Sequence, residues 1–155
     1  MKRIALILAL MLAPATALAA DGVWTSGYGQ GISEANVVNR DGVTLRVACP
    51  DAALERAPSV SLDVPGLEGG ENRRVVTLIN IGGRTVTLDF RRRVLDQNQV
   101  VYTWDATGQQ RRIFDDLVFN LSRGRSVTVG INSERIRETF PLSGARAALE
   151  ACSAD

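Results

Sequence analysis

From Ser33 onward, apolar and polar residues alternate with the period of two that is typical of β-strands. Asp41-Gly42 and Gly82-Gly83 interrupt this alternation as short hairpin turns. The pattern places strands, by residue range, at 35–39, 43–49, 60–64, 73–81, 84–94, 100–104 and 127–131. Roughly eight strands with closely spaced turns predict an all-β fold, either an antiparallel β-sandwich or a flattened barrel.

Two segments depart from the alternation. Residues 117–121 form a compact apolar stretch whose type, helix or strand, the pattern leaves open. At the end of the chain, Ser143 can cap a helix whose apolar residues recur at offsets of three and four, at Ala145, Ala148, Leu149 and Cys152. We therefore expect one short C-terminal helix with a single apolar stripe.

The first nineteen residues have the three parts of a cleavable signal peptide. Lys2 and Arg3 are basic, residues 4–12 are apolar, and Ala17-Leu18-Ala19 supplies small residues at positions −3 and −1. A membrane anchor needs ~20 apolar residues, more than this run contains. We expect cleavage before Ala20, no transmembrane segment in the mature chain, and a periplasmic or secreted protein.

The mature chain, residues 20–155, has the length of one domain. Its first part, residues 20–32, is rich in glycine and is expected to be a flexible lead. The spacing Gly27-x-Gly29-x-Gly31 resembles a phosphate-binding loop, but such a loop needs a preceding strand, and here the mature chain has only begun.

The amino-acid composition limits the reactions that the mature chain can catalyse. Removing residues 1–19 takes Lys2 and Arg3 and no acid, so 16 basic and 17 acidic residues remain and the formal net charge changes from +1 to −1. A near-neutral domain has no general attraction for nucleic acid. Lys2 is the only lysine and there is no histidine. Ser–His–Asp, Cys–His and Ser–Lys sites are therefore excluded, and we predict no enzyme activity, cofactor or metal site.

The two cysteines, Cys49 and Cys152, each fall on the apolar face of their predicted element. Export takes them to an oxidising compartment, where an even number of cysteines favours a disulfide. A redox or nucleophilic thiol would need a CxxC motif or a neighbouring histidine, and the sequence has neither. We predict a Cys49–Cys152 bond that joins the terminal helix to the first hairpin.

Charged clusters leave two alternatives open. A candidate anion patch for phosphate or lipid head groups is formed by Arg91, Arg93, Arg111 and Arg112. Alternatively, these arginines lie on a solvated sheet face or edge, where their charge prevents aggregation. Asp105, Asp115 and Asp116 offer carboxylates for glycoside hydrolysis or metal binding. Adjacent acids on an extended strand point to opposite faces, which argues against joint action of the last two.

The order of several segments resembles small periplasmic β-sandwich proteins of Gram-negative bacteria, namely the invasion-associated locus B family and the VasI-like accessory proteins of type VI secretion. The similar segments include Val47-Ala48-Cys49-Pro50, the strand Tyr102-Thr103-Trp104, and the tail from Phe140-Pro141-Leu142-Ser143-Gly144 to Cys152. The resemblance implies an all-β periplasmic domain with no catalytic residues to carry over.

Three functions follow as hypotheses. The first is a non-enzymatic accessory domain that binds another envelope protein, with its oligomeric state open. The second is a small anion- or lipid-binding module that uses the arginine patch. The third is a hydrolase that uses carboxylates.

Overall fold

The computed structural model describes residues 22–67, 69–96 and 98–153. The predicted signal peptide, residues 1–19, and its cleavage site before Ala20 lie outside the described residues. The strands are β1 (Thr25–Gly29), β2 (Ile32–Val38), β3 (Thr44–Pro50), β4 (Ser59–Pro65), β5 (Arg73–Ile81), β6 (Arg84–Asp96), β7 (Gln99–Asp105), β8 (Ser126–Ile131) and β9 (Ile136–Pro141). The helices are α1 (Gln110–Arg123) and α2 (Ala145–Ala148), and the short 3-10 turns are η1 (Asn132–Glu134) and η2 (Glu150–Cys152).

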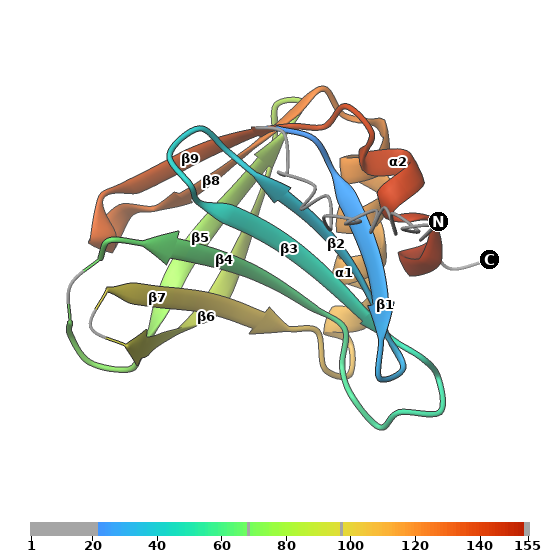
Figure 1. The fold of residues 1–155 in the computed structure, drawn as a ribbon, viewed down its shortest axis with the longest axis horizontal. Coiled ribbons are helices and arrows are strands. Elements are labelled where there is room, and N and C mark those ends of the chain that lie inside the picture. The colour runs from blue at the N-terminus through green and yellow to red at the C-terminus, as the bar shows by residue number, and fades with distance from the viewer. Residues whose placement is uncertain (1–21, 68, 97, 154–155) are drawn as a thin grey trace, which may run out of the picture.

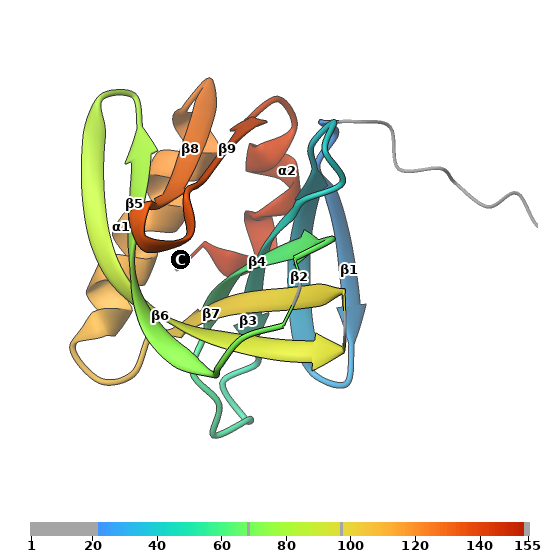
Figure 2. The same cartoon turned by 90° about the vertical axis from the view of Figure 1, so that its left-hand side faces the viewer.

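All nine strands belong to one antiparallel sheet in the order β1-β2-β3-β4-β7-β6-β5-β8-β9. The sheet curls into a half-barrel. Helix α2 lies between the β8–β9 end and the β1–β2 end of the sheet, and α1 packs beside α2 (Figures 1 and 2). The predicted all-β class is confirmed, and the flattened barrel describes it better than two separate sheets. The right-handed twist of long strands, such as the 13-residue β6, lets one sheet enclose a core without a second sheet.

The period-two pattern marks the inner face of the sheet. In β3, Leu45, Val47 and Cys49 are buried, whereas Arg46 is exposed. The inner face and the helices share one apolar core, whose largest fully buried side chains include Tyr102, Phe90, Phe114, Phe140, Leu45 and Leu62. Burial of apolar area at about 25 cal/mol per Å² is the main force that stabilises such a core.

Helix α1 corrects the prediction of a single C-terminal helix. Its buried residues are spaced at i, i+3, i+4 and i+7, at Phe114, Leu117, Val118 and Leu121. This spacing is helical, but in the sequence the nearly continuous apolar run at 117–121 hides the helical period. The helix supplies side chains to the open side of the curled sheet, which strands alone leave uncovered.

The C-terminal segment forms two short helical turns. The predicted stripe is confirmed, because Ala145, Ala148, Leu149 and Cys152 are all buried. The predicted Ser143 cap is wrong: Gly144 is the N-cap, with a φ of +84° that favours glycine, and no side chain caps the helix.

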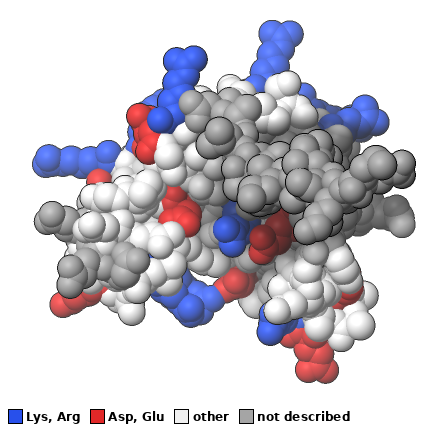
Figure 3. Space-filling model, in the orientation of Figure 1, with Lys and Arg blue, Asp and Glu red and all other residues white. Residues whose placement is uncertain are grey.

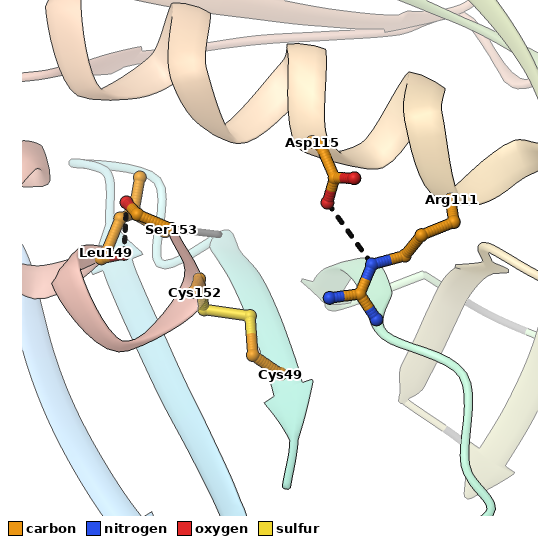
Figure 4. The surroundings of a disulfide bond; sticks show 6 residues. All are labelled: Cys49, Arg111, Asp115, Leu149, Cys152 and Ser153. Atoms are coloured by element: carbon orange, nitrogen blue, oxygen red, sulfur yellow. Dashed lines mark hydrogen bonds and ion pairs between the residues drawn. A yellow bond between two sulfur atoms is a disulfide. The ribbon is translucent and has the colours of Figure 1, made fainter. Parts of the chain in front are cut away.

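The predicted disulfide is present. Cys49 in β3 and Cys152 in η2 are bonded, with their Cα atoms 5.4 Å apart. Figure 4 shows the bond between the C-terminal turn and the strand. It closes a separation of 103 residues and holds the helical end of the chain against the sheet.

The glycine-rich start is an edge strand, which corrects the expected flexible lead. Residues Thr25–Gly29 pair with β2 in antiparallel register. Trp24, just before this strand, is 6% exposed, and its indole Nε1 donates a hydrogen bond of 2.8 Å to the carbonyl of Pro141 in β9. Pairing with β2 and the buried indole order a segment whose own composition has low strand propensity.

We predict that Trp24→Phe lowers the free energy of unfolding by about 1 kcal/mol, because it removes one largely buried hydrogen bond while keeping an aromatic ring. Urea unfolding measures this, with Val76→Thr, which alters an exposed side chain on β5, as the control. Amide exchange in β1 should accelerate in Trp24→Phe alone. An unchanged exchange rate in β1 would show that Trp24 does not anchor the strand.

Candidate functional site

The half-barrel has two sheet edges, and the β9 edge is closed to further pairing at its Pro141 end. Leu142 N donates to Arg125 O at 3.0 Å, so even-numbered residues of β9 bond to β8 and odd-numbered residues face outward. Pro141 has no N–H to offer, and its carbonyl already accepts the Trp24 indole. Charged side chains and proline are common ways to protect an edge strand from further pairing.

The β1 edge is open. Asp51 N donates to Gly31 O at 2.8 Å, so odd-numbered residues of β2 bond to β3 and even-numbered residues bond to β1. By the register of β1 against β2, the N–H and C=O groups of Ser26 and Tyr28 point away from β2. Within the described part of the chain, β1 has no second neighbouring strand. This strand contains neither a charged residue nor a proline.

A groove of about 540 Å³ runs along this edge. One wall is β1 with the adjoining part of β2, and the other is α2 with η2. Most of the lining side chains are small, at Ser26, Gly27, Ser33, Ala147, Ala148 and Ala151. Small side chains leave the backbone of β1 accessible to another extended chain. The disulfide holds the second wall in place, because Cys152 ends η2.

Two acidic residues line the groove. They are Glu34 and Glu150, and no basic residue of the described part of the chain lines it. Gly27 pairs with Glu34 across the two strands and has no side chain that could screen the carboxylate. Arg46 Nη1 lies 3.9 Å from Glu34 Oε1, with both side chains more than a third exposed, so this pair is weak. Among the described residues, Glu150 has no ion-pair partner.

Tyr28 places an aromatic ring at the open edge. Its side chain is 70% exposed, and its hydroxyl donates a hydrogen bond of 2.7 Å to Asp51 Oδ2. This hydrogen bond to a carboxylate raises the pKa of Tyr28 above its ordinary value. Exposed tyrosine is enriched in protein interfaces because it offers a large contact area with few rotatable bonds.

The structure does not bring the four candidate anion-binding arginines together as a free cluster. Arg91 pairs with Asp105, and Arg111 Nε lies 3.2 Å from Asp115 Oδ1 within α1 (Figure 4). Arg93 and Arg112 are exposed and have no carboxylate partner among the described residues. Half of the candidate patch is therefore already neutralised by carboxylates.

The carboxylates considered for hydrolysis lie on two different elements. Asp105 ends β7 and pairs with Arg91, whereas Asp115 and Asp116 lie on α1. Their position on a helix corrects the expectation that they lie on an extended strand. In the described ranges, no three metal-ligating side chains gather closely enough to hold an ion.

A buried ionic cluster was missed by the sequence reasoning. Arg92 is 5% exposed, and its guanidinium donates to the carbonyls of Gly69 and Glu71. Its Nε lies 3.5 Å from Glu134 Oε1, which also accepts from Arg73 Nη2 at 2.7 Å. The Glu134 carboxylate raises the pKa of Arg73. This cluster ties the β4–β5 loop and η1 to the sheet.

Arg92 was detectable from the pattern, because it is in phase with the inward residues Leu88 and Phe90 of β6. Tyr102 lies opposite Arg92 on β7, and burial raises the pKa of its phenol. The Tyr102 hydroxyl and the Thr77 hydroxyl are both buried without a hydrogen-bond partner in the described structure. The interior therefore carries polar groups alongside its apolar core.

The surface charge is mixed. Figure 3 shows acidic and basic side chains interspersed over one face, with no broad field of one sign. Neither helix of the described part of the chain has the length and apolar character needed to cross a membrane.

Comparison with known proteins gives one match. The model of the YfjT family matches residues 22–149, from the residues before β1 to the end of α2. No curated protein and no solved structure matches the chain. The resemblance to invasion-associated locus B and VasI-like proteins stays a prediction. Because the matched segment covers nearly the whole described domain, the chain belongs to the YfjT family.

Proposed function

We propose that this protein is an exported, non-enzymatic domain of the cell envelope that binds another envelope protein, and that β1 is the contact edge. The observation that carries the proposal is the contrast between the two sheet edges. Pro141 and Trp24 close one end of the β9 edge and the charged Arg137 faces outward from the rest, whereas β1 presents the backbone groups of Ser26 and Tyr28, without a charged residue, beside a groove. Strand addition to an exposed edge is a general mode of peptide recognition.

The occupant is an extended segment of a different protein rather than a second copy of this chain. Antiparallel pairing of two β1 strands would place two acidic groove linings, each with Glu34 and Glu150, at one interface. Like charges at an interface disfavour association. Export to the periplasm, expected from residues 1–19, makes an envelope protein the available partner.

We predict that a photocrosslinking phenylalanine analogue at position 28 captures a defined protein in the cells that produce this chain. Ser26→Pro should abolish this adduct, because proline removes an outward N–H without removing a bond to β2. The same analogue at position 139, which faces outward on the β9 edge beside Pro141, is the matched control. Mass spectrometry of the adducts and thermal melting of Ser26→Pro, which should match the wild type, complete the measurement.

Three results would overturn the proposal. One is equal capture from positions 28 and 139, and another is an adduct that Ser26→Pro leaves intact. The third is slow amide exchange at Ser26 and Tyr28 in the isolated mature protein, since those amides would then be paired within the protein itself.

A further inference from the structure

Resting on the proposed function, we infer that the segment bound at β1 is a cationic extended peptide that carries lysine or arginine at positions flanked by small residues. The open edge alone does not specify the chemistry of the partner. The charge of the groove and the size of its lining side chains do.

Charge complementarity selects a cation. Glu34 and Glu150 line the groove, where the described ranges place no basic residue, and Asp51 accepts a hydrogen bond from the Tyr28 hydroxyl at the same edge. Glu34 lies opposite Gly27, whereas Glu150 comes from η2 across the groove. An added strand would therefore have a carboxylate near each of its two faces. Alternate side chains of that strand, which point to opposite faces, could each reach one acid.

Side-chain size selects the neighbouring residues. On the wall formed by α2 and η2, Ala147, Ala148 and Ala151 line the groove together with Glu150. On the wall formed by β1 the lining is Ser26, Gly27 and Tyr28. The C-terminal wall lies close beside β1 (Figure 1) and is fixed through Cys152. Because the disulfide keeps this wall from moving away, the groove of about 540 Å³ limits the size of the side chains that face it, and we infer small ones.

We predict that selection from a displayed library of random peptides, with the mature protein as bait, enriches peptides with lysine or arginine interleaved with small residues. Binding of a selected peptide should weaken about tenfold in Glu150→Lys. Asp89→Lys, which makes the same charge change at an exposed site on β6, should bind as the wild type does. Added salt should weaken binding because the charges are partly exposed.

Backbone pairing is tested separately from charge. N-methylation of the selected peptide at alternate residues should abolish binding in one phase and preserve it in the other, since only alternate amides can bond to β1. Peptide binding should slow amide exchange at Ser26 and Tyr28, and Ser26→Pro should lose binding. Loss of binding on N-methylation in both phases or in neither would overturn strand addition.

The outcomes separate the two proposals. Enrichment of neutral or acidic peptides that still require an open Ser26 amide would overturn the cationic inference and leave the proposed function standing. Failure to enrich any peptide, or binding that Glu150→Lys and Asp89→Lys weaken equally, would also overturn the inference. Crosslinking at position 28 in cells decides the proposed function independently of these results.

Discussion

Replacing both cysteines, Cys49→Ala with Cys152→Ala, is expected to lower the free energy of unfolding by about 4 kcal/mol. The bond closes a separation of 103 residues, and in the chain-entropy model a loop of that size restricts the unfolded chain strongly. Both half-cystines are buried, so their replacement also removes packed sulfur atoms from the core. Urea unfolding of the two proteins under oxidising conditions measures the difference.

The control is the wild-type protein in excess reductant, which loses the cross-link but keeps the buried sulfur atoms, so it should unfold at a urea concentration between those of the oxidised wild type and the double variant. Amide exchange should accelerate first in α2 and η2, because only the disulfide joins that end of the chain covalently to β3. A loss of less than about 1 kcal/mol would show that core packing alone holds the C-terminal turn, contrary to the loop-entropy expectation.

Glu134→Ala is expected to lower the free energy of unfolding by about 3 kcal/mol, because it leaves the guanidinium of Arg92 buried without its counter-ion. The Glu134 side chain is 12% exposed and the Arg92 side chain 6% exposed, so little solvent can replace the lost carboxylate. Gly70, in the β4–β5 loop, lies so close to this guanidinium that a Cβ at Gly70 would be 3.0 Å from the guanidinium nitrogens. Because the β4–β5 loop contacts Arg92, we expect Glu134→Ala to loosen this loop as well.

Arg73→Ala removes the other partner of the same carboxylate and is the matched control. The Arg73 side chain is 54% exposed, and an ion pair to an exposed cation adds little stability, so we expect unfolding close to that of the wild type. Chemical unfolding of both variants makes the comparison. Equal destabilisation by the two substitutions would contradict the view that burial of Arg92 sets the cost.

Local patterns in the sequence predicted much of the fold. Strand alternation placed Leu45, Val47 and Cys49 on the inner face, and Gly82-Gly83 joins β5 to β6 as a two-residue turn with positive φ at both glycines. The disulfide followed because two independent periodicities each put a cysteine on a buried face. These features depend on side-chain spacing and turn chemistry, which are local properties of the chain.

The candidate site was missed for the opposite reason. Two of the five residues of β1 are glycines, which disfavour strands, and β1 forms because its backbone pairs with β2 and Trp24 reaches Pro141 on a distant strand. The groove likewise needs α2 and η2 beside β1. Glu34 and Glu150 lie far apart in the sequence, so no local spacing could indicate that they share a surface.

The sequence by itself determined the strand and turn pattern, the apolar stripe of the C-terminal segment, the two cysteine positions, and the absence of histidine and of lysine beyond Lys2. Only the tertiary structure decided that one sheet curls into a half-barrel, that Trp24 and Pro141 close one end of the β9 edge, and that β1 stays open beside a groove lined by two acids. Side-chain periodicity is encoded along the chain, whereas the state of a sheet edge depends on which distant backbone groups find a partner.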